Sequence, residues 1–394
     1  MLRPRHIART MNDPQTSPLA LYVHWPFCVS KCPYCDFNSH VRASVDQAAW
    51  REALLADLAH EARLTGERPL GSIFFGGGTP SLMPPETVGA IIAAADRAWG
   101  FASDIEITLE ANPSSVEAAR FADLAAAGVN RVSLGLQALD DAALRFLGRA
   151  HDVKEGLAAL GTAQAAFGRV NFDLIYARPG QTLASWQSEL AQALSFGTEH
   201  LSLYQLTIEP GTRFATEAAA GRLTIPDSDA AADLFEATRA ITSAAGLPAY
   251  EVSNHAPPGA ESRHNLAYWR YTGYVGIGPG AHGRRGGLAT TRHRKPENWL
   301  DAVARNGHGL QGEDPLTSRD RAAEALVMGL RLSDGLDFAR LASEGIDMAQ
   351  VLDEAALMRL AETGLIERAA GRLRLTDAGA PLLYAVLREI VRTA

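Results

Sequence analysis

The chain has 394 residues, of which 47% are hydrophobic and 21% are charged, and it carries a net charge of −8 at pH 7. This length exceeds one ordinary domain and predicts one large body with a smaller second domain. The acidic balance disfavours a nucleic-acid-binding protein, and no apolar run reaches the roughly 18 residues of a membrane span, so no stable membrane insertion is expected.

The N-terminal segment, residues 1–18, has three arginines but no apolar stretch of the kind that a secretory signal needs. We expect a disordered extension here, with an Arg-rich organellar presequence as the alternative and Met11 as a second possible start. All three cysteines of the chain fall in one short stretch, at Cys28, Cys32 and Cys35. Clustered cysteines without partners elsewhere indicate a reducing compartment, and we therefore expect a cytoplasmic protein.

Residues 19–255 repeat one pattern, in which a short apolar or β-branched run precedes an Ala/Leu-rich helix. Helices are expected at 47–64 and 114–128, and the strands are expected at 21–25, 72–78, 105–111, 131–137, 170–176, 201–207 and 249–254. Alternating strands and helices favour a parallel sheet, because parallel strands need crossover connections. The pattern predicts an α/β fold, either an open doubly wound sheet or a partly closed barrel.

Polar residues stand at the ends of the predicted strands. They are the cysteine loop, the glycines at 76–78, Glu110, Gln137, Asp173 and Gln205. Ligands of both kinds of α/β sheet bind at the carboxyl ends of the strands. We therefore expect these groups to line one shared site, although each alone could also be a helix cap or an ordinary turn residue.

The last part of the chain has a different pattern. Residues 256–317 are expected to connect the barrel to a C-terminal domain at 318–394, where two helices, a hairpin-like stretch and a closing helix follow one another. This order is typical of a winged helix. Such a domain can bind nucleic acid, but the acidic chain favours a structural cap or a partner surface.

The spacing C-x3-C-x2-C places three sulfurs on one loop that can surround a single metal centre. A zinc site would need a fourth ligand, for which His24 or His40 could serve. A four-iron cubane held by three thiolates leaves one iron without protein sulfur, so that a small chelating molecule can bind there. The spacing favours the iron–sulfur centre, and zinc remains the alternative.

The stretch "CVSKCPYC" resembles the cysteine motif of the radical S-adenosylmethionine (SAM) superfamily, in which an aromatic residue, here Tyr34, precedes the last cysteine. "FFGGGTP", with Gly77, Gly78 and Thr79, resembles the glycine motif of that superfamily. The resemblance implies a partial (β/α)6 barrel with a [4Fe–4S] cluster on the three cysteines, and SAM chelated at the fourth iron. It also implies an electron donor, because electron transfer to the sulfonium yields a deoxyadenosyl radical.

Over residues 19–385 the chain also resembles the family of oxygen-independent coproporphyrinogen III oxidase and of haem chaperones of the HemW type. The segments that carry this likeness are "LYVHWPFC", "LEANP", "SLGLQALDDAALRFLGRAH" and "NFDLIYARPGQT". By resemblance, their polar residues contact the ribose, carboxylate and adenosyl groups of SAM. These residues are Tyr22, Glu110, Gln137, Arg149 and Asp173.

Three departures favour the chaperone over the oxidase. Phe37 stands where the oxidases have a fourth cysteine, "RHNLAYW" matches an H-N-x-x-Y-W stretch of the chaperones, and "LYQLTIEPGT" differs from the oxidases. The resemblance then implies haem as a further ligand, with His264 as first candidate for its iron and Tyr268 and His282 after it. It implies transfer of haem to acceptor proteins, respiratory ones among them, and no catalytic residue is assigned.

Two alternatives stay open from the sequence. One is a true radical enzyme that decarboxylates the propionates of coproporphyrinogen III. The other is a zinc-stabilised binding module with a winged-helix tail.

Overall fold

The structure is a computed structural model that describes residues 18–66 and 68–392. Except for Pro18, the predicted N-terminal extension lies outside these described residues. Nowhere in the described ranges is a helix both long enough and apolar enough to span a bilayer.

The described chain builds a mixed sheet of eleven strands. In sheet order they are β13 (Leu310–Pro315), β12 (Leu288–Arg292), β11 (His282–Arg285), β10 (Tyr274–Ile277), β1 (Leu19–Trp25), β4 (Leu70–Gly77), β5 (Phe101–Ala111), β6 (Arg131–Gln137), β7 (Arg169–Tyr176), β8 (His200–Gln205) and β9 (Asn254–His255). The run from β10 to β8 is parallel, and the outer pairs are antiparallel. The sheet is curved but open, which confirms the expected α/β fold with a partial barrel.

Six of the predicted strands correspond to β1 and β4–β8, whereas two expectations need correction. The strand expected at 249–254 is reduced to β9, because the Glu251 carboxylate accepts hydrogen bonds from the backbone of Ser253 and the side chain of Asn254 and folds this stretch into a turn. The helix expected at 114–128 is two helices, interrupted around Arg120, whose guanidinium bonds the carbonyls of Ser81 and Met83. The pairing of β10 with β1 was not predicted from the sequence.

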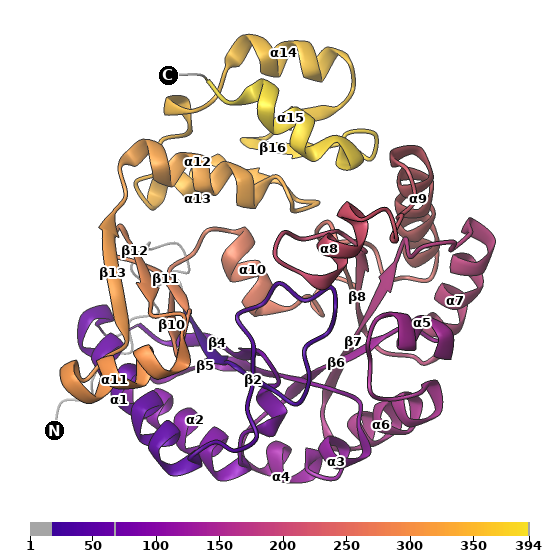
Figure 1. The fold of residues 1–394 in the computed structure, drawn as a ribbon. Helices are drawn as coiled ribbons and strands as arrows, with labels where there is room; N and C mark the ends of the chain where they lie inside the picture. Colours follow the sequence, from indigo (N-terminus) through magenta and orange to yellow (C-terminus); the bar gives the residue numbers. More distant parts are fainter. Residues whose placement is uncertain (1–17, 67, 393–394) are drawn as a thin grey trace, which may run out of the picture.

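One face of the sheet is apolar and is covered by helices. Side chains such as Leu21, Ile73, Phe75, Leu109 and Leu134 are fully buried there. The helices that follow the first strands form an arc around this convex face (Figure 1). They are α1 (Gln47–Thr65), α2 (Pro85–Trp99), α3 (Ser115–Ala118), α4 (Phe121–Ala126), α5 (Asp141–Phe146), α6 (Val153–Ala166), α7 (Leu183–Ser195) and α9 (Ser228–Ala244), with α11 (Pro296–Asn306) beside α1.

The opposite, concave face of the parallel strands is unusually polar. Side chains alternate between the two faces of a strand, so the residues between the buried apolar ones share this second face. They include Tyr22, Phe74, Thr108, Glu110, Ser133, Asn171, Asp173, Ser202 and Tyr204. Because a polar sheet face does not pack as a hydrophobic core, this face is free to form a site.

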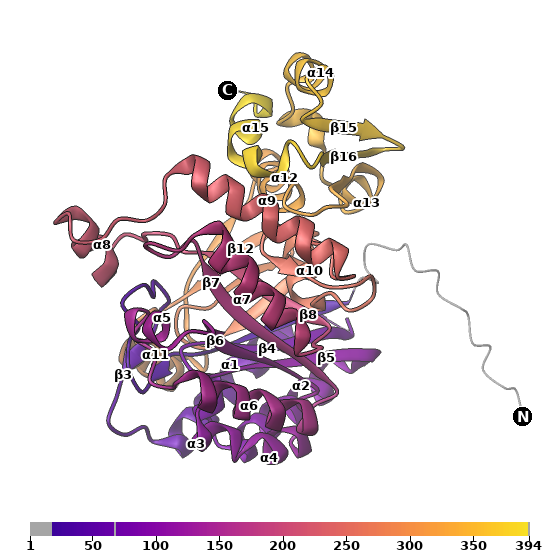
Figure 2. The ribbon, with the colours of Figure 1, turned by 90° about the vertical axis from the view of Figure 1, so that its right-hand side faces the viewer.

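Four further segments surround the concave face. The short strands β2 (Phe27–Cys28) and β3 (His40–Val41) enclose the cysteine loop, and the turn η1 (Pro80–Leu82) follows the glycines. Helix α10 (Arg263–Trp269) contacts β4 and β1. An arm formed by residues 206–226 carries α8 (Arg213–Ala219) and projects from the body of the protein (Figure 2).

The C-terminal domain has its own hydrophobic core, with Leu326, Leu373 and Ile390 among the buried residues. It lies above α9 and α10 in the view of Figure 2. Its elements are α12 (Ser318–Gly329), β14 (Leu336–Asp337), α13 (Phe338–Ser343), η2 (Met348–Gln350), α14 (Glu354–Glu362), β15 (Ile366–Ala369), β16 (Arg372–Leu375), η3 (Ala380–Leu382) and α15 (Leu383–Ile390). The predicted helices and hairpin are present, and β14 and α13 are additions.

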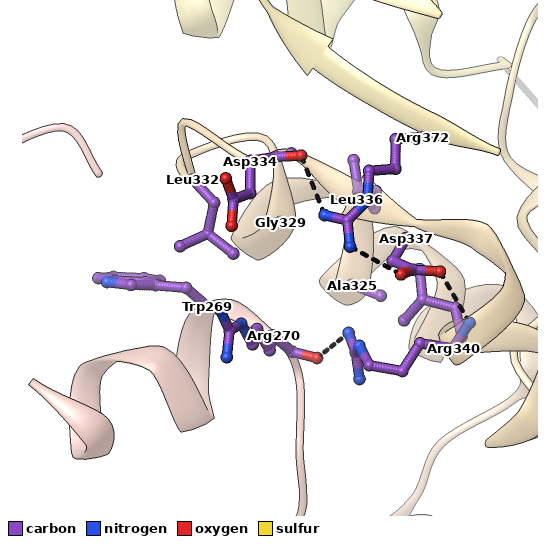
Figure 3. A pocket seen from close by; sticks show the side chains of 12 residues that line it. Trp269, Arg270, Ala325, Gly329, Leu332, Asp334, Leu336, Asp337, Arg340 and Arg372 are labelled. Carbon is purple, nitrogen blue, oxygen red and sulfur yellow. Dashed lines mark hydrogen bonds and ion pairs between the residues drawn. The ribbon is translucent and has the colours of Figure 1, made fainter. Parts of the chain in front are cut away.

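The C-terminal domain meets α10 around a small pocket of about 280 Å³ (Figure 3). Arg340 donates to the carbonyl of Arg270, and Arg372 pairs with Asp337 at 2.9 Å. Beside the pocket, the Arg331 guanidinium lies 4.4 Å from the centre of the Trp269 ring. The end of the "HNLAYW" stretch is therefore held by the C-terminal domain.

Candidate functional site

The cysteine loop is a short loop that begins at the end of β1. Its two ends are joined because the His40 N–H donates to the Pro26 carbonyl at 2.7 Å, and β2 pairs with β3. Inside the loop, the Cys35 N–H donates to the Cys32 carbonyl at 3.2 Å. All three thiols are unpaired and half-buried. Burial raises the pKa of the Cys28 and Cys35 thiols, so both are protonated at neutral pH until a ligand takes the proton's place.

A chain of hydrogen bonds joins two of the cysteines through three other segments. Arg149 donates from Nη1 to the Cys32 sulfur at 3.3 Å and from Nη2 to Asn112 Oδ1 at 2.6 Å. Asn112 in turn donates to Thr79 Oγ1 at 3.1 Å, and Thr79 donates to the Cys28 sulfur at 3.5 Å. The cysteine loop is thereby tied to the exits of β4 and β5 and to the segment after α5.

The donor set fits an iron–sulfur group better than it fits zinc. Among the described residues, no group of three or more His, Cys, Asp or Glu side chains, the three cysteines included, is arranged to hold a metal ion, so the choice between the two centres depends on the available fourth ligands. His24, a possible fourth zinc ligand, is buried and uses both ring nitrogens, donating from Nε2 to the Asn38 carbonyl and accepting at Nδ1 from the Tyr22 hydroxyl, both at 3.0 Å. Three thiols remain as donors, and Arg149 beside them has a buried Nε without a partner. Thiolates are the usual ligands of iron–sulfur clusters, and a neighbouring cation favours the thiolate form.

The glycines at the end of β4 let this strand pass close to the start of the cysteine loop. A Cβ atom at Gly77 would lie 2.6 Å from the ring of His24, and one at Gly78 would lie 2.7 Å from the Phe27 carbonyl oxygen. Gly77 also has a φ of +113°, which side-chain-bearing residues rarely adopt. The close approach lets the Gly78 and Thr79 N–H groups donate to the carbonyls of Trp25 and Phe27.

We predict that Gly77→Ala destabilises the protein by two separate effects. The positive φ costs about 1 kcal/mol, and the contact with His24 adds about 1–3 kcal/mol of overpacking. Gly100→Ala is the matched control, because Gly100 also has a positive φ of +68° but has open space around its Cβ position. Urea unfolding measures both variants, and equal losses of unfolding free energy would show that His24 does not crowd this position.

Two carboxyl groups lie together on the concave face, and within the part of the chain that the structure describes no cation is bonded to either. Glu110 accepts a hydrogen bond from the Gly77 N–H at 3.2 Å, and Asp173 accepts from Ser133 and Asn171 at 3.3 and 3.1 Å. Burial, with some repulsion from Asp173, raises the pKa of Glu110 to about 8. Burial also raises the pKa of Asp173 to about 6, against the lowering effect of its hydrogen bonds. Such a pair favours a ligand that brings positive charge or hydroxyl donors.

The raised pKa of Glu110 gives a stability prediction with a definite sign. Between the ordinary value of 4.5 and the folded value of about 8, the folded protein holds a proton that the unfolded chain has released. The stability of the ligand-free protein therefore falls as the pH rises through this window and levels off above it. In Glu110→Gln, which keeps a neutral side chain, the fall between about pH 5 and about pH 8 should be smaller by about 1–2 kcal/mol.

Glu106 provides the control for this prediction on the same face of β5. Its carboxylate pairs with Arg169 at 2.7 Å and accepts from the His264 backbone N–H at 3.2 Å. Glu106→Gln should therefore destabilise the protein at both pH values. Thermal unfolding at the two pH values measures both variants, and an unchanged slope in Glu110→Gln would contradict the assigned shift.

The remaining residues predicted for SAM lie around the same edge of the sheet. The Tyr34 hydroxyl lies beside Arg149 and Cys32. The centre of the Tyr34 ring is 6.3 Å from the centre of the Phe214 ring. The Tyr22 phenol lies close to Glu110, and burial raises its pKa far above the usual range. Gln137 ends β6 with a φ of +71°, an uncommon conformation for a residue with a side chain. Strained backbone of this kind is frequent at ligand sites.

His264 and Tyr268 lie at the other end of the concave face. The two ring nitrogens of His264 share hydrogen bonds with the hydroxyls of Ser72 at 3.0 Å and Tyr268 at 2.9 Å. His264 is 1% exposed, and burial lowers its pKa to about 3, so its ring is neutral. Ser72 lies five residues before Gly77 on β4, which is about 16 Å along the strand. To bind iron, His264 would have to release one of its two hydrogen bonds.

The structure thus brings most of the predicted residues to one edge of the sheet and leaves three apart. The three cysteines, Thr79 and Arg149 form one hydrogen-bonded group, and Tyr22, Gly77, Glu110 and Asp173 lie next to it on the concave face. His264 and Tyr268 form a second group, and His282 is exposed on β11.

Three residues of this region were missed by sequence reasoning. Asn112, which bridges Arg149 and Thr79, stands two positions after Glu110 in "LEANP", so the motif itself contained the signal. Tyr204 lies on the same face of β8 as Ser202, and Asp173 and Glu110 act on its phenol electrostatically. Phe214, on the arm, donates its N–H to the Pro33 carbonyl at 2.9 Å, and no local pattern pointed to that contact.

Comparisons with known proteins give matches at both ends of the chain. The family description "Radical SAM superfamily" matches residues 22–192, and "HemN C-terminal domain" matches residues 316–382. The bovine protein named "Radical S-adenosyl methionine domain-containing protein 1, mitochondrial" is 43% identical over 332 residues, which are 82% of this chain and 75% of the relative. The "Heme chaperone HemW" of Escherichia coli is 40% identical over 322 residues, 80% of this chain and 83% of the relative.

The "Heme chaperone HemW" of Mycobacterium tuberculosis is 35% identical over 378 residues, 95% of each chain. Among solved structures, coproporphyrinogen III oxidase (HemN) from Escherichia coli matches with a TM-score of 0.78 and 24% identity, over 96% of this chain and 91% of that one. At that identity the likeness establishes a shared fold. The fold similarity extends through the barrel and the C-terminal domain.

Proposed function

Because this chain belongs to the radical SAM superfamily, and within it to the HemW family, we propose that it is a haem chaperone. In this proposal it binds a [4Fe–4S] cluster on its three cysteines, SAM beside the cluster, and haem, which it passes to acceptor proteins. The observation that carries the proposal is the group formed by the three cysteines, Arg149, Asn112 and Thr79 next to two unpaired carboxyl groups.

The three cysteine sulfurs would hold the cluster, and the surrounding residues would set its environment. When bound, the cluster supplies an open iron for the methionine end of SAM and an electron for its sulfonium. Arg149, which donates to the Cys32 sulfur, would compensate the charge of the ligated cysteine, and its buried Nε could donate to a carboxylate. Thr79 donates to the sulfur of Cys28, a contact of the kind that tunes cluster potential.

Glu110 and Asp173 would orient SAM from the concave face. Each offers a carboxylate oxygen that can accept from an ammonium or hydroxyl group. Binding of a cationic ligand would also favour the ionised form of both groups, which burial otherwise disfavours. Tyr34, beside Cys32, offers an aromatic edge for the adenine.

The position of Phe37 supports the chaperone over the oxidase. The chain has three cysteines in all, and Phe37, at the place where the resemblance puts a fourth cysteine in the oxidases, is 60% exposed. A large exposed apolar side chain next to the cluster loop suits contact with another apolar surface better than it suits metal binding. The relatives from Escherichia coli and Mycobacterium tuberculosis, which cover 80% and 95% of this chain, carry the name of haem chaperone.

The test is haem transfer by the anaerobically reconstituted protein. The proposal predicts that the protein takes up haem, shown by a Soret band that elutes with it, and that apomyoglobin and an apo-form of a respiratory haem protein then acquire this haem. No conversion of coproporphyrinogen III is expected when SAM and a reductant are present. Decarboxylation of coproporphyrinogen III at many turnovers per chain would instead establish the oxidase.

A further inference from the structure

A second pocket, of about 650 Å³, lies against the cysteine loop. Its wall is formed by three segments: the loop itself, the end of α5 with the turn after it, and the arm at 206–226. Cys32 and Cys35 reach this pocket, whereas Tyr22, Glu110 and Asp173 of the concave face do not line it. The pocket is therefore a separate approach to the cysteines from the outer surface.

The rim of this pocket is strongly cationic. Lys31, Arg145, Arg213 and Arg222 line it, and Glu217, which pairs with Arg222 at 2.6 Å, is the acidic residue among them. Lys31, Arg145 and Arg213 are exposed, and within residues 18–66 and 68–392 the side chain of none of the three makes a hydrogen bond or an ion pair. In a chain with a net charge of −8, such unpaired cations do not follow from composition. They are available to an acidic partner.

The floor of the pocket is apolar and is fixed to the cysteine loop. Phe146 and Phe214 stack with ring centres 4.8 Å apart and an interplanar angle of 26°. Phe214 also bonds the Pro33 carbonyl through its N–H at 2.9 Å, and Pro33 lies between Cys32 and Cys35. An apolar centre surrounded by a polar or charged rim is the usual composition of a protein docking site. A partner seated there would lie directly over the loop.

We infer that this basic pocket is the docking site of an acidic protein that donates single electrons to the cluster. The inference rests on the proposed cluster at Cys28, Cys32 and Cys35. In the step itself, a flavin hydroquinone anion of the donor loses one electron and becomes the neutral semiquinone, and the oxidised cluster gains that electron. No bond breaks and no proton moves, so the donor needs proximity and not entry into the barrel.

Charge complementarity favours an acidic protein over haem as the occupant. The positively charged side chains lie on the exposed rim. There they attract the acidic surface of an approaching protein and raise its rate of association. Haem would need an iron ligand in addition to partners for its propionates, and no histidine lines this pocket. Among its lining residues, the cysteines are already assigned to the cluster.

Charge reversal of two rim residues tests the inference. We use Arg145→Glu with Arg213→Glu in the cluster-loaded protein, and oxidised flavodoxin, an acidic flavoprotein, as the binding probe. Arg97→Glu with Arg388→Glu is the control, because it changes the net charge equally. Both arginines are exposed, lie on α2 and α15, and make no side-chain hydrogen bond or ion pair among the described residues. Isothermal titration at about 50 mM and about 500 mM salt gives the affinity.

The expected result is at least a tenfold loss of flavodoxin affinity in the rim variant at low salt, no comparable loss in the control, and weaker wild-type binding at high salt. Stopped-flow reduction of the cluster by flavodoxin hydroquinone should slow in parallel, while reduction by photoreduced deazaflavin, a small donor, should not. Equal binding by the wild type and the rim variant would overturn the inference. So would loss of haem uptake with flavodoxin binding intact, because the rim would then serve haem. Haem is absent from the binding assay, so its outcome is independent of the haem-transfer test.

Discussion

Serine in place of Cys28, Cys32 or Cys35 is expected to abolish cluster assembly. The iron content after anaerobic reconstitution should fall from about four per chain to near zero, because a serine oxygen is a poor substitute for a soft thiolate at iron. The chain has no other cysteine that could replace the lost ligand. Iron and acid-labile sulfide assays measure the effect directly.

Ser39→Ala is the control for the cysteine variants. The Ser39 hydroxyl lies 3.9 Å from the Cys35 sulfur in the same loop, yet it is not a proposed ligand. This variant should keep its iron, with at most a changed reduction potential, since hydrogen bonds to cluster sulfurs tune that potential. Serine variants that retain a full complement of iron would contradict the assignment of the ligands.

Replacement of His264 by alanine is expected to weaken haem binding at least tenfold. This expectation comes from the resemblance, and the structure adds a difficulty, because His264 is buried and bonded at both ring nitrogens. The alanine variant leaves the hydroxyls of Ser72 and Tyr268 without their partner, at a cost of about 1–3 kcal/mol each. A loss of haem binding could then follow from local unfolding alone.

Tyr268→Phe separates the two explanations. This change removes one hydroxyl and frees the Nε2 atom of His264 while it keeps the aromatic packing against Tyr274 at 4.5 Å. If His264 binds the haem iron through Nε2, the variant should bind haem as tightly as the wild type or more tightly. Haem titration, with thermal unfolding in parallel, measures this. Normal haem affinity in a folded His264→Ala variant would remove His264 from the candidates.

The parts of the site that could be predicted from the sequence are those defined by motifs of closely spaced residues. The cysteine loop, the glycine exit at Gly77 and the carboxyl groups Glu110 and Asp173 all follow from motifs of a few residues at the ends of alternating strands. Since parallel strands end at one edge, local pattern was enough to expect them to be neighbours. The curved sheet and the helical arc follow from the same alternation.

The parts that the sequence did not predict depend on contacts between distant segments. Arg149 and Asn112 are 37 positions apart, and His264 meets Ser72 across 192 positions. The pairing of β10 with β1 and the contact of Phe214 with Pro33 are equally remote. Periodicity describes which face of an element is buried, but it does not say which partner covers that face. His264 could therefore be recognised in its motif without its two hydrogen bonds being foreseen.

The measurement that tests the central claim most directly is electron paramagnetic resonance of the anaerobically reconstituted and reduced protein, with and without SAM. The account predicts a brown protein with acid-labile sulfide, and a signal of the reduced cluster that changes when SAM binds the iron left open by the three cysteines. A colourless protein that holds zinc alone would contradict it.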